Sequence, residues 1–145
     1  MHRVERSVLV PYSATEMFDL VADIKSYPSF LPWCAGTHVR PKGEGQVEAT
    51  VDIAYKGVKS SFTTLNEHEV PREIRMHLVD GPFRRLGGEW TFTELRQDAC
   101  KVHLCLHFQF ASGLVGRMIA PVFEGIASSM VDAFSRRAET VYGER

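Results

Sequence analysis

The sequence predicts an α+β fold in which a curved antiparallel sheet of about seven strands wraps around one long C-terminal helix. Three observations lead to this expectation. Apolar and polar residues alternate through most of residues 46–110, which is the period of half-buried strands. Helical spacing of apolar residues is confined to a short N-terminal segment and to the last 30 residues. Short turns between the strands favour an antiparallel meander.

The N-terminal part of the chain is expected to form one strand and one short helix. Residues 3–10 are rich in Val and Leu and stop at Pro11, as expected for an opening strand. Ser13 and Glu16 have the spacing of a capping box, whose hydroxyl and carboxylate bind free backbone N–H groups at a helix start. Apolar residues follow at helical spacing, so we expect a helix from about Ala14 to Asp23.

The middle of the chain is expected to form successive strands. Gly57 allows a tight turn between the first two of these strands. A later strand, which contains Ile74 to Leu78, ends at Gly81 and Pro82. The expected strands cover residues 46–55, 58–64, 74–78, 89–95 and 100–110. The expected order of elements is strand, helix, six strands and long helix, and five of these six strands have the ranges given above.

The last 30 residues carry one apolar stripe at helical spacing, from Val115 to Val141. We expect one long helix here that covers the sheet. Pro121 cannot donate a backbone hydrogen bond and disfavours a helical Ala120. The helix is therefore expected to start, break or kink at Pro121.

Composition limits the class of protein. A chain of 145 residues has the size of one domain, so we expect a single domain over residues 1–145. It lacks the run of about 20 apolar residues that spans a bilayer, and its N-terminus lacks the features of a signal peptide, so we expect a cytoplasmic protein. Three cysteines without an export signal predict free thiols. A net charge of −1 argues against DNA as a partner.

Three separated strings carry a resemblance to a known family. They are Tyr27–Cys34 (YPSFLPWC), Gly81–Phe83 with Leu86, Gly88 and Trp90, and Met130–Phe134 with Arg137 and Ala138. The strings resemble the coenzyme Q-binding START-like proteins of the helix-grip superfamily, whose bacterial members include ribosome-association toxins. The similarity runs in register from about Val4 to Tyr142.

The resemblance implies a hydrophobic cavity between sheet and C-terminal helix that holds an isoprenoid quinone (ubiquinone) or another lipid and supports respiration. The toxin description implies instead that the protein binds the large ribosomal subunit and blocks subunit joining. Our leading expectation is non-enzymatic quinone binding, with peripheral contact at the inner membrane and no cofactor besides the bound ligand. Polyketide cyclases in the wider superfamily leave an enzyme as a minor alternative.

Candidate ligand-binding residues come from the Tyr27–Trp33 segment, the inward strand positions and the helix. The segment is either a plug that closes the core or a gate at a cavity mouth, and most of the other positions are expected to be plain core. Tyr55, Asn66 and Trp90 could donate hydrogen bonds to a quinone head. The candidates are Phe30, Leu31, Trp33, Val51, Ile53, Tyr55, Phe62, Asn66, Met76, Leu78, Phe83, Trp90, Val122, Phe123, Ile126 and Met130.

Small residues on the helix leave two alternatives open. They could make room for a ligand, or they could let helix and sheet approach closely. These residues are Gly125, Ser128, Ser129 and Ala133.

Other constellations favour ordinary surface or core roles. His103, Cys105 and His107 share one strand face, but we place that face in solvent and expect no metal, because a flat row cannot easily surround a tetrahedral ion. Glu67 and Glu69 are expected at a solvated edge rather than as a catalytic pair. Cys34 has no neighbouring base that would make it a nucleophile.

Cations in the turns are candidates for contact with a partner. Arg84 and Arg85 are expected in a turn between Gly81 and Gly88. They could contact rRNA phosphates or anionic lipid, or simply keep the protein soluble. Arg40, Lys42, Lys56 and Lys59 are expected in or near other turns.

Overall fold

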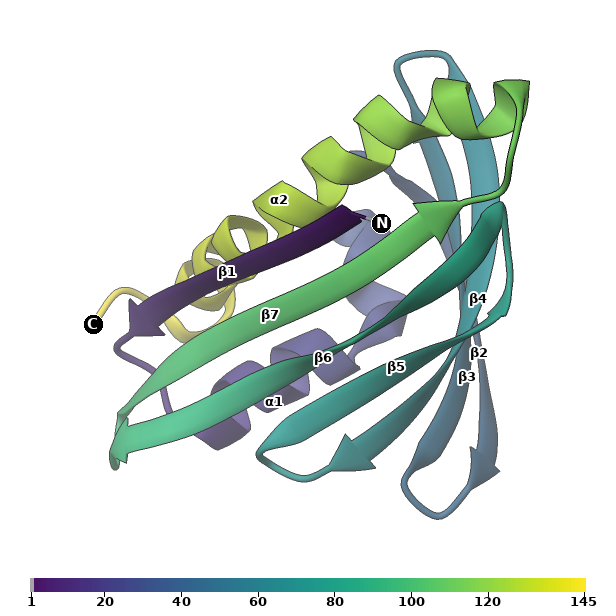
Figure 1. The fold of residues 1–145 in the computed structure, drawn as a ribbon. Coiled ribbons are helices and arrows are strands. Elements are labelled where there is room, and N and C mark those ends of the chain that lie inside the picture. Colours follow the sequence, from purple (N-terminus) through teal and green to yellow (C-terminus); the bar gives the residue numbers. More distant parts are fainter. Residues whose placement is uncertain (1) are drawn as a thin grey trace.

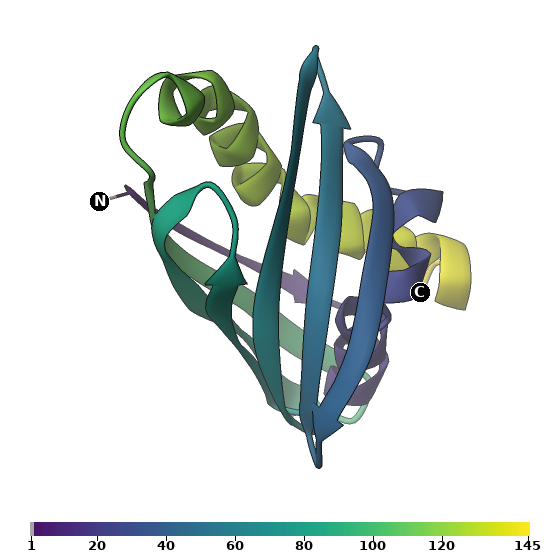
Figure 2. The same cartoon turned by 90° about the vertical axis from the view of Figure 1, so that its right-hand side faces the viewer.

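A computed structural model describes residues 2–145, apart from the side chain of Val115. Its seven strands form one antiparallel sheet in the order β1-β7-β6-β5-β4-β3-β2, and α2 lies across the inner side of this strongly curved sheet (Figures 1 and 2). In chain order the elements are β1 (His2–Val10), α1 (Ala14–Ala22), the 3-10 helix η1 (Ile24–Ser29), β2 (Cys34–Gly43), β3 (Gln46–Tyr55), β4 (Val58–Glu69), β5 (Glu73–Asp80), β6 (Phe83–Arg96), β7 (Ala99–Phe110) and α2 (Leu114–Tyr142). The predicted fold class is confirmed.

The capping box at the start of α1 is present. The Glu16 backbone N–H donates to the Ser13 hydroxyl at 3.1 Å, and the Ser13 N–H donates to the Glu16 carboxylate at 2.9 Å. These two bonds satisfy donors that a helix start leaves free. Met17, Phe18 and Val21 are buried on the inner face of α1.

The strand β2 is an edge strand that the alternation of the sequence does not delimit. Its outer half is exposed and contains Pro41, which an edge strand tolerates because one side of the strand is unpaired. Arg40 and Lys42, which are expected in or near a turn, lie at the end of this strand, just before the turn to β3. Their side chains pair with the Glu48 carboxylate on β3 at 3.5 and 3.0 Å.

The strand β6 begins at Phe83, well before the predicted residue 89, so Arg84 and Arg85 lie on a strand rather than in a turn. Sequence reasoning treated the two glycines that follow as the end of a turn. Gly88 in fact lies inside the strand with φ 154°, where a Cβ would stand 2.1 Å from the carbonyl oxygen of Cys105. Glycine is needed here because the strands β6 and β7 approach so closely.

The helix α2 passes through Pro121 without a break, so the predicted start or break there is wrong. Pro121 is exposed, whereas Ile119 and Phe123 on either side of it are buried. Packing of these neighbours against the sheet holds the helix across the missing hydrogen bond. Among the described residues, no helix is long and apolar enough to cross a membrane.

Aromatic side chains fill the space between α2 and the sheet. Phe134 is fully buried, with ring centroids 5.4 Å from those of Tyr27, Phe30 and Trp90. Edge-to-face pairs of this kind add to the free energy gained by apolar burial. One aromatic cluster therefore connects the helix α2, the segment after η1 and the strand β6.

Candidate functional site

A small cavity lies between the inner face of the sheet and α2, with a volume of about 80 Å³. Its lining includes the predicted residues Trp33, Val51, Phe62, Asn66, Met76, Trp90, Phe123, Ile126 and Met130. Residues that sequence reasoning did not single out complete it: Ile24, Tyr27, Ala49, Thr64, Leu86, Leu104, Leu106 and Ala127. Thr64, Leu104 and Leu106 lie at inward-facing positions of the alternating pattern, so the sequence pattern could have identified them as lining residues.

A second hollow, which we call the outer groove, lies between α2, the segment after η1 and the end of β3, and has a volume of about 590 Å³. It is lined by Phe30, Leu31, Pro32, Trp33, Tyr55, Lys56, Pro121, Val122, Gly125, Ile126, Ser129, Asp132, Ala133, Arg136, Arg137 and Thr140. Trp33 and Ile126 line both hollows. These two side chains therefore form the wall between the cavity and the outer groove.

Four predicted ligand-binding residues lie elsewhere than expected: three line neither hollow, and one lines the outer groove instead of the cavity. Ile53, Leu78 and Phe83 line neither, and Phe83 packs instead on Phe123 with ring centroids 4.9 Å apart. Tyr55 was expected inside but lies on the outer groove with 39% of its surface exposed, because it is the last residue of β3.

The polar groups in the cavity are few. Thr64 donates a hydrogen bond to the Asn66 side-chain oxygen at 2.8 Å, and both residues are buried. The Tyr27 hydroxyl donates to the carbonyl of Val21, and burial raises the pKa of Tyr27. The Asn66 amide is thus the polar group best suited to orient a ligand in an otherwise apolar lining.

The cavity is small for the ligand that the sequence suggested. Benzene occupies an engineered protein cavity of about 150 Å³, and the cavity here measures about 80 Å³. A substituted quinone ring is larger than benzene. Binding therefore requires movement of a lining side chain. Trp33 and Ile126 border the outer groove, and Phe62, Met76 and Met130 are only half-buried.

The described residues that line the cavity include no carboxylate, imidazole or amine. General acid–base catalysis needs such a group within hydrogen-bond reach of the substrate. The cysteines are free, as predicted, and burial raises the pKa of Cys34 and raises that of Cys100 to about 11. Thiols in this state are poor nucleophiles.

His103, Cys105 and His107 share one face of β7, and all three were expected in solvent. One of them is buried. Cys105 is buried, although we expected it in solvent, because it is flanked by Glu5 and Glu89 on the neighbouring strands. His103 contacts the Glu5 carboxylate at 2.8 Å, and His107 is exposed. Within the described part of the chain, no three His, Cys, Asp or Glu side chains are grouped so that they could hold a metal ion.

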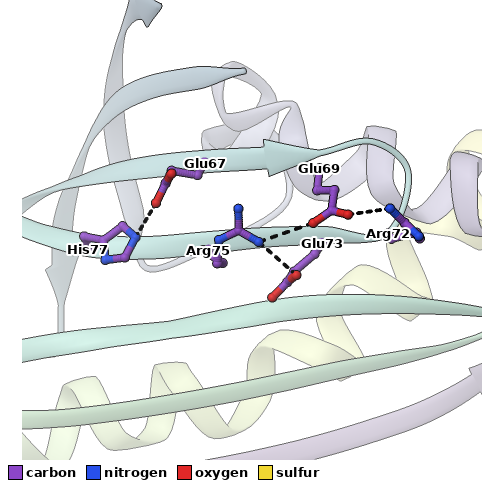
Figure 3. Close-up of polar contacts among 6 residues, drawn as sticks. All are labelled: Glu67, Glu69, Arg72, Glu73, Arg75 and His77. Atoms are coloured by element: carbon purple, nitrogen blue, oxygen red, sulfur yellow. Dashed lines mark hydrogen bonds and ion pairs between the residues drawn. The ribbon is translucent and has the colours of Figure 1, made fainter. Parts of the chain in front are cut away.

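Glu67 and Glu69 point outward from β4 into ion pairs (Figure 3). Glu67 contacts the His77 ring at 2.6 Å. Glu69 pairs with Arg72 and Arg75, and Arg75 also contacts Glu73 at 3.0 Å. Each carboxylate therefore has a polar partner on the neighbouring residues, as on an ordinary solvated sheet face.

The two arginines that we expected to face a partner are both exposed. Arg84 and Arg85 lie at the start of β6, where Arg85 is opposite Gln109 of β7. Within the ranges that the structure describes, no ion pair engages either guanidinium. Both charges are available to solvent or to a partner.

Most of the chain matches one known protein family. A family described as polyketide cyclase / dehydrase and lipid transport matches residues 10–135. The chain belongs to this family. The resemblance drawn from the three sequence strings is confirmed.

Relatives of known name cover the whole chain. The ribosome association toxin RatA of Vibrio cholerae is 46% identical over 144 residues, covering 99% of this chain and 100% of that one. RatA of Escherichia coli K12 is 43% identical over 145 residues, covering 100% of this chain and 92% of that one. The mitochondrial coenzyme Q-binding protein COQ10 homolog B of Xenopus laevis is 27% identical, covering 96% of this chain and 59% of that one.

Solved structures share the fold. The Zhui aromatase/cyclase of Streptomyces sp. R1128 has a TM-score of 0.82 and 19% identity over 99% of both chains. A START superfamily protein of Mycobacterium smegmatis has a TM-score of 0.80 and 20% identity, covering 97% of this chain and 99% of that one. At such identities the likeness concerns the fold alone.

Proposed function

We propose that this protein is a non-enzymatic, ribosome-associating protein of the cytoplasm. The observation that carries the proposal is the 43–46% identity to proteins named ribosome association toxin RatA, over nearly the full length of both chains. The cavity lining supports the absence of catalysis, since its described residues include no carboxylate, imidazole or amine, and its one phenol, Tyr27, already donates its proton to the Val21 carbonyl. The partner is the large ribosomal subunit, as the family resemblance implies.

The exposed arginines at the start of β6 form the part of the surface that we assign to the ribosome. Arg85 pairs with Gln109 of β7, and Arg84 lies at a bulge between the paired residues Phe83 and Arg85, so strand pairing on both sides holds the backbone of the two arginines. Fixed cations of this kind bind phosphate with less loss of conformational freedom than cations on a mobile loop. Arginine also suits phosphate because its guanidinium can donate two hydrogen bonds at once.

Co-sedimentation with purified large subunits at several salt concentrations tests this function. Arg84→Ala with Arg85→Ala should weaken association and reduce the slope of log K against log salt by about 1.5, because about two phosphate contacts are lost. The matched control is Arg6→Ala with Arg96→Ala, which removes two exposed arginines elsewhere. Wild-type protein that remains in the supernatant at low salt would refute the proposal.

A second function, binding of an isoprenoid quinone or similar lipid, is favoured by the apolar cavity with its single amide. The COQ10 relative supports the same ligand. Organic extraction of purified protein, followed by mass spectrometry, tests it. A stoichiometric amount of quinone in the extract supports this function. If the protein carries no lipid but still sediments with large subunits, quinone binding is refuted and ribosome association is the remaining function.

A further inference from the structure

The outer groove is distinct from the cavity in size and in charge. Its volume of about 590 Å³ lies within the range of about 300–1,000 Å³ that is usual for small-molecule sites. Three cations, Lys56, Arg136 and Arg137, line it together with one carboxylate, Asp132. By contrast, the described lining of the cavity holds neither cations nor carboxylates.

Two of the three cations are held in place by aromatic rings. The Arg137 guanidinium lies over the ring of Phe30, 4.8 Å from its centroid. The Lys56 ammonium lies 5.3 Å from the ring centroid of Tyr55. All four side chains line the groove. The Arg137 charge comes from α2, and the Lys56 charge comes from the turn between β3 and β4. Within the described residues, no carboxylate forms an ion pair with Lys56, Arg136 or Arg137.

The rest of the groove is apolar and open. Phe30, Pro32, Pro121 and Val122 supply the apolar surface that is still accessible, whereas Leu31, Trp33 and Ile126 are already buried. A Cβ added at Gly125 would meet no atom within 4 Å, so there is free space directly above the helix backbone. An apolar chain can lie along this surface and remove it from water, which is favourable by about 25 cal/mol per Å².

From the charge and the shape together, we propose that the outer groove binds a single-chain anionic amphiphile, with its headgroup at Lys56, Arg136 and Arg137 and its alkyl chain along Val122, Gly125 and Ile126. The apolar surface distinguishes this ligand from a free anion. The excess of cations distinguishes it from a neutral quinone. The site goes beyond ribosome association and does not depend on it.

Nucleic acid is the alternative occupant of a groove with cations and aromatic rings. The structure favours the amphiphile, because Trp33 is buried and Phe30 packs edge-to-face on Phe134. Neither ring offers a free face on which a base could stack. Tyr55, the other aromatic residue of the described lining, is 39% exposed with Lys56 over its ring, so it is a single stacking position rather than a row of them. An RNA oligonucleotide is therefore included below as a competing probe.

Calorimetric titration with laurate, below its micelle concentration, tests the proposal. Wild-type protein should bind one laurate, while acetate and dodecyltrimethylammonium should bind at least about tenfold more weakly, because one lacks the chain and the other reverses the charge. Replacing Lys56, Arg136 and Arg137 by Gln should weaken laurate binding about tenfold or more. Lys25, Arg96 and Lys101 are exposed and lie outside the groove, so their replacement by Gln is the matched charge control.

Gly125→Leu provides a steric test that leaves all charges in place. The new side chain should fill the groove and abolish laurate binding, while helix propensity favours Leu over Gly. Gly125→Ala, with its single methyl group, should change affinity by no more than about twofold. Equal laurate binding by wild-type and folded Gly125→Leu protein would overturn the proposal and place the chain in the cavity.

Two further outcomes would also overturn the proposal. One is the absence of laurate binding to folded wild-type protein. The other is an RNA oligonucleotide that binds in place of laurate and is lost in the triple Gln variant. Co-sedimentation of Gly125→Leu with large subunits is measured separately, so the groove and the ribosome proposal can fail independently.

Discussion

Arg145 donates two hydrogen bonds to the Glu16 carboxylate, from Nη1 to Oε1 at 2.7 Å and from Nη2 to Oε2 at 2.9 Å. This pair joins the segment after α2 to the first turn of α1. Two tyrosines reinforce it: Tyr142 donates to the Glu16 carbonyl at 2.9 Å, and Tyr12 donates to the Gly143 carbonyl at 2.7 Å. The same carboxylate thus caps α1 and anchors the chain after α2.

The pair predicts a dependence of stability on pH. The hydrogen bonds from Arg145, followed by the backbone N–H of Ser13, lower the pKa of Glu16 from 4.5 to about 2. A carboxyl whose folded pKa is lowered stabilises the fold above its unfolded pKa and loses this contribution as the pH falls toward the folded pKa. Stability should therefore decline between about pH 4.5 and pH 2.

Glu16→Gln should lower the free energy of unfolding at neutral pH by about 1 kcal/mol, a value reduced for partial exposure of the pair. It should also flatten the decline in acid, as measured by urea unfolding. Arg145→Gln serves as the partner control, and the double variant should add little to either single change. An unchanged acid profile in Glu16→Gln would show that other carboxyls cause the decline.

Trp33→Leu should enlarge the cavity and open it to the outer groove. The variant should bind duroquinone, a quinone ring without a tail, more tightly than wild-type protein, because the volume then approaches the roughly 150 Å³ that accommodates benzene. Leu31→Ala is the matched control, since Leu31 is buried and lines only the groove. Equal duroquinone affinity in both variants would exclude Trp33 as the limiting side chain.

Gly88→Ala should destabilise the protein by about 3 kcal/mol or more, because a methyl group at this position overlaps the backbone of β7. Gly57→Ala is the comparison: its φ is also positive, at 79°, but nothing lies within 4 Å of the added Cβ. It should cost about 1 kcal/mol. Thermal unfolding of both variants measures the difference, and similar midpoints would contradict the role of close strand approach.

His103→Gln with His107→Gln should change the free energy of unfolding by about 0.5 kcal/mol or less, because both side chains lie on the outer face. Elemental analysis of wild-type protein should find no stoichiometric zinc. Zinc that is present in the wild type and lost from the double variant would contradict this prediction.

The sequence predicted those elements whose signal is local. The capping box at Ser13 and the alternation along β7 depend on neighbouring residues, and both are present in the structure. The start of β6 could not be predicted, because Gly87 and Gly88 ordinarily end strands and only the approach of β7 explains them here. The edge strand β2 was not delimited, because half of it faces solvent and alternates little.

The candidate site was predictable in part for the same reason. Inward parity identified Phe62, Asn66 and Trp90 as neighbours of the cavity. The outer groove could not be found, since its cations come from a turn at Lys56 and from the last turns of α2, about 80 residues apart in the chain. Its charge pattern exists only once the fold has brought these segments together.

The wall formed by Trp33 and Ile126 makes the two hollows thermodynamically coupled. A molecule in the outer groove that packs against Trp33 favours the closed position of the indole, and so opposes any occupant of the cavity that needs the indole to move. Reciprocity then requires that such an occupant weaken binding in the groove by the same factor. Competition between the two ligands would be seen although they occupy different hollows.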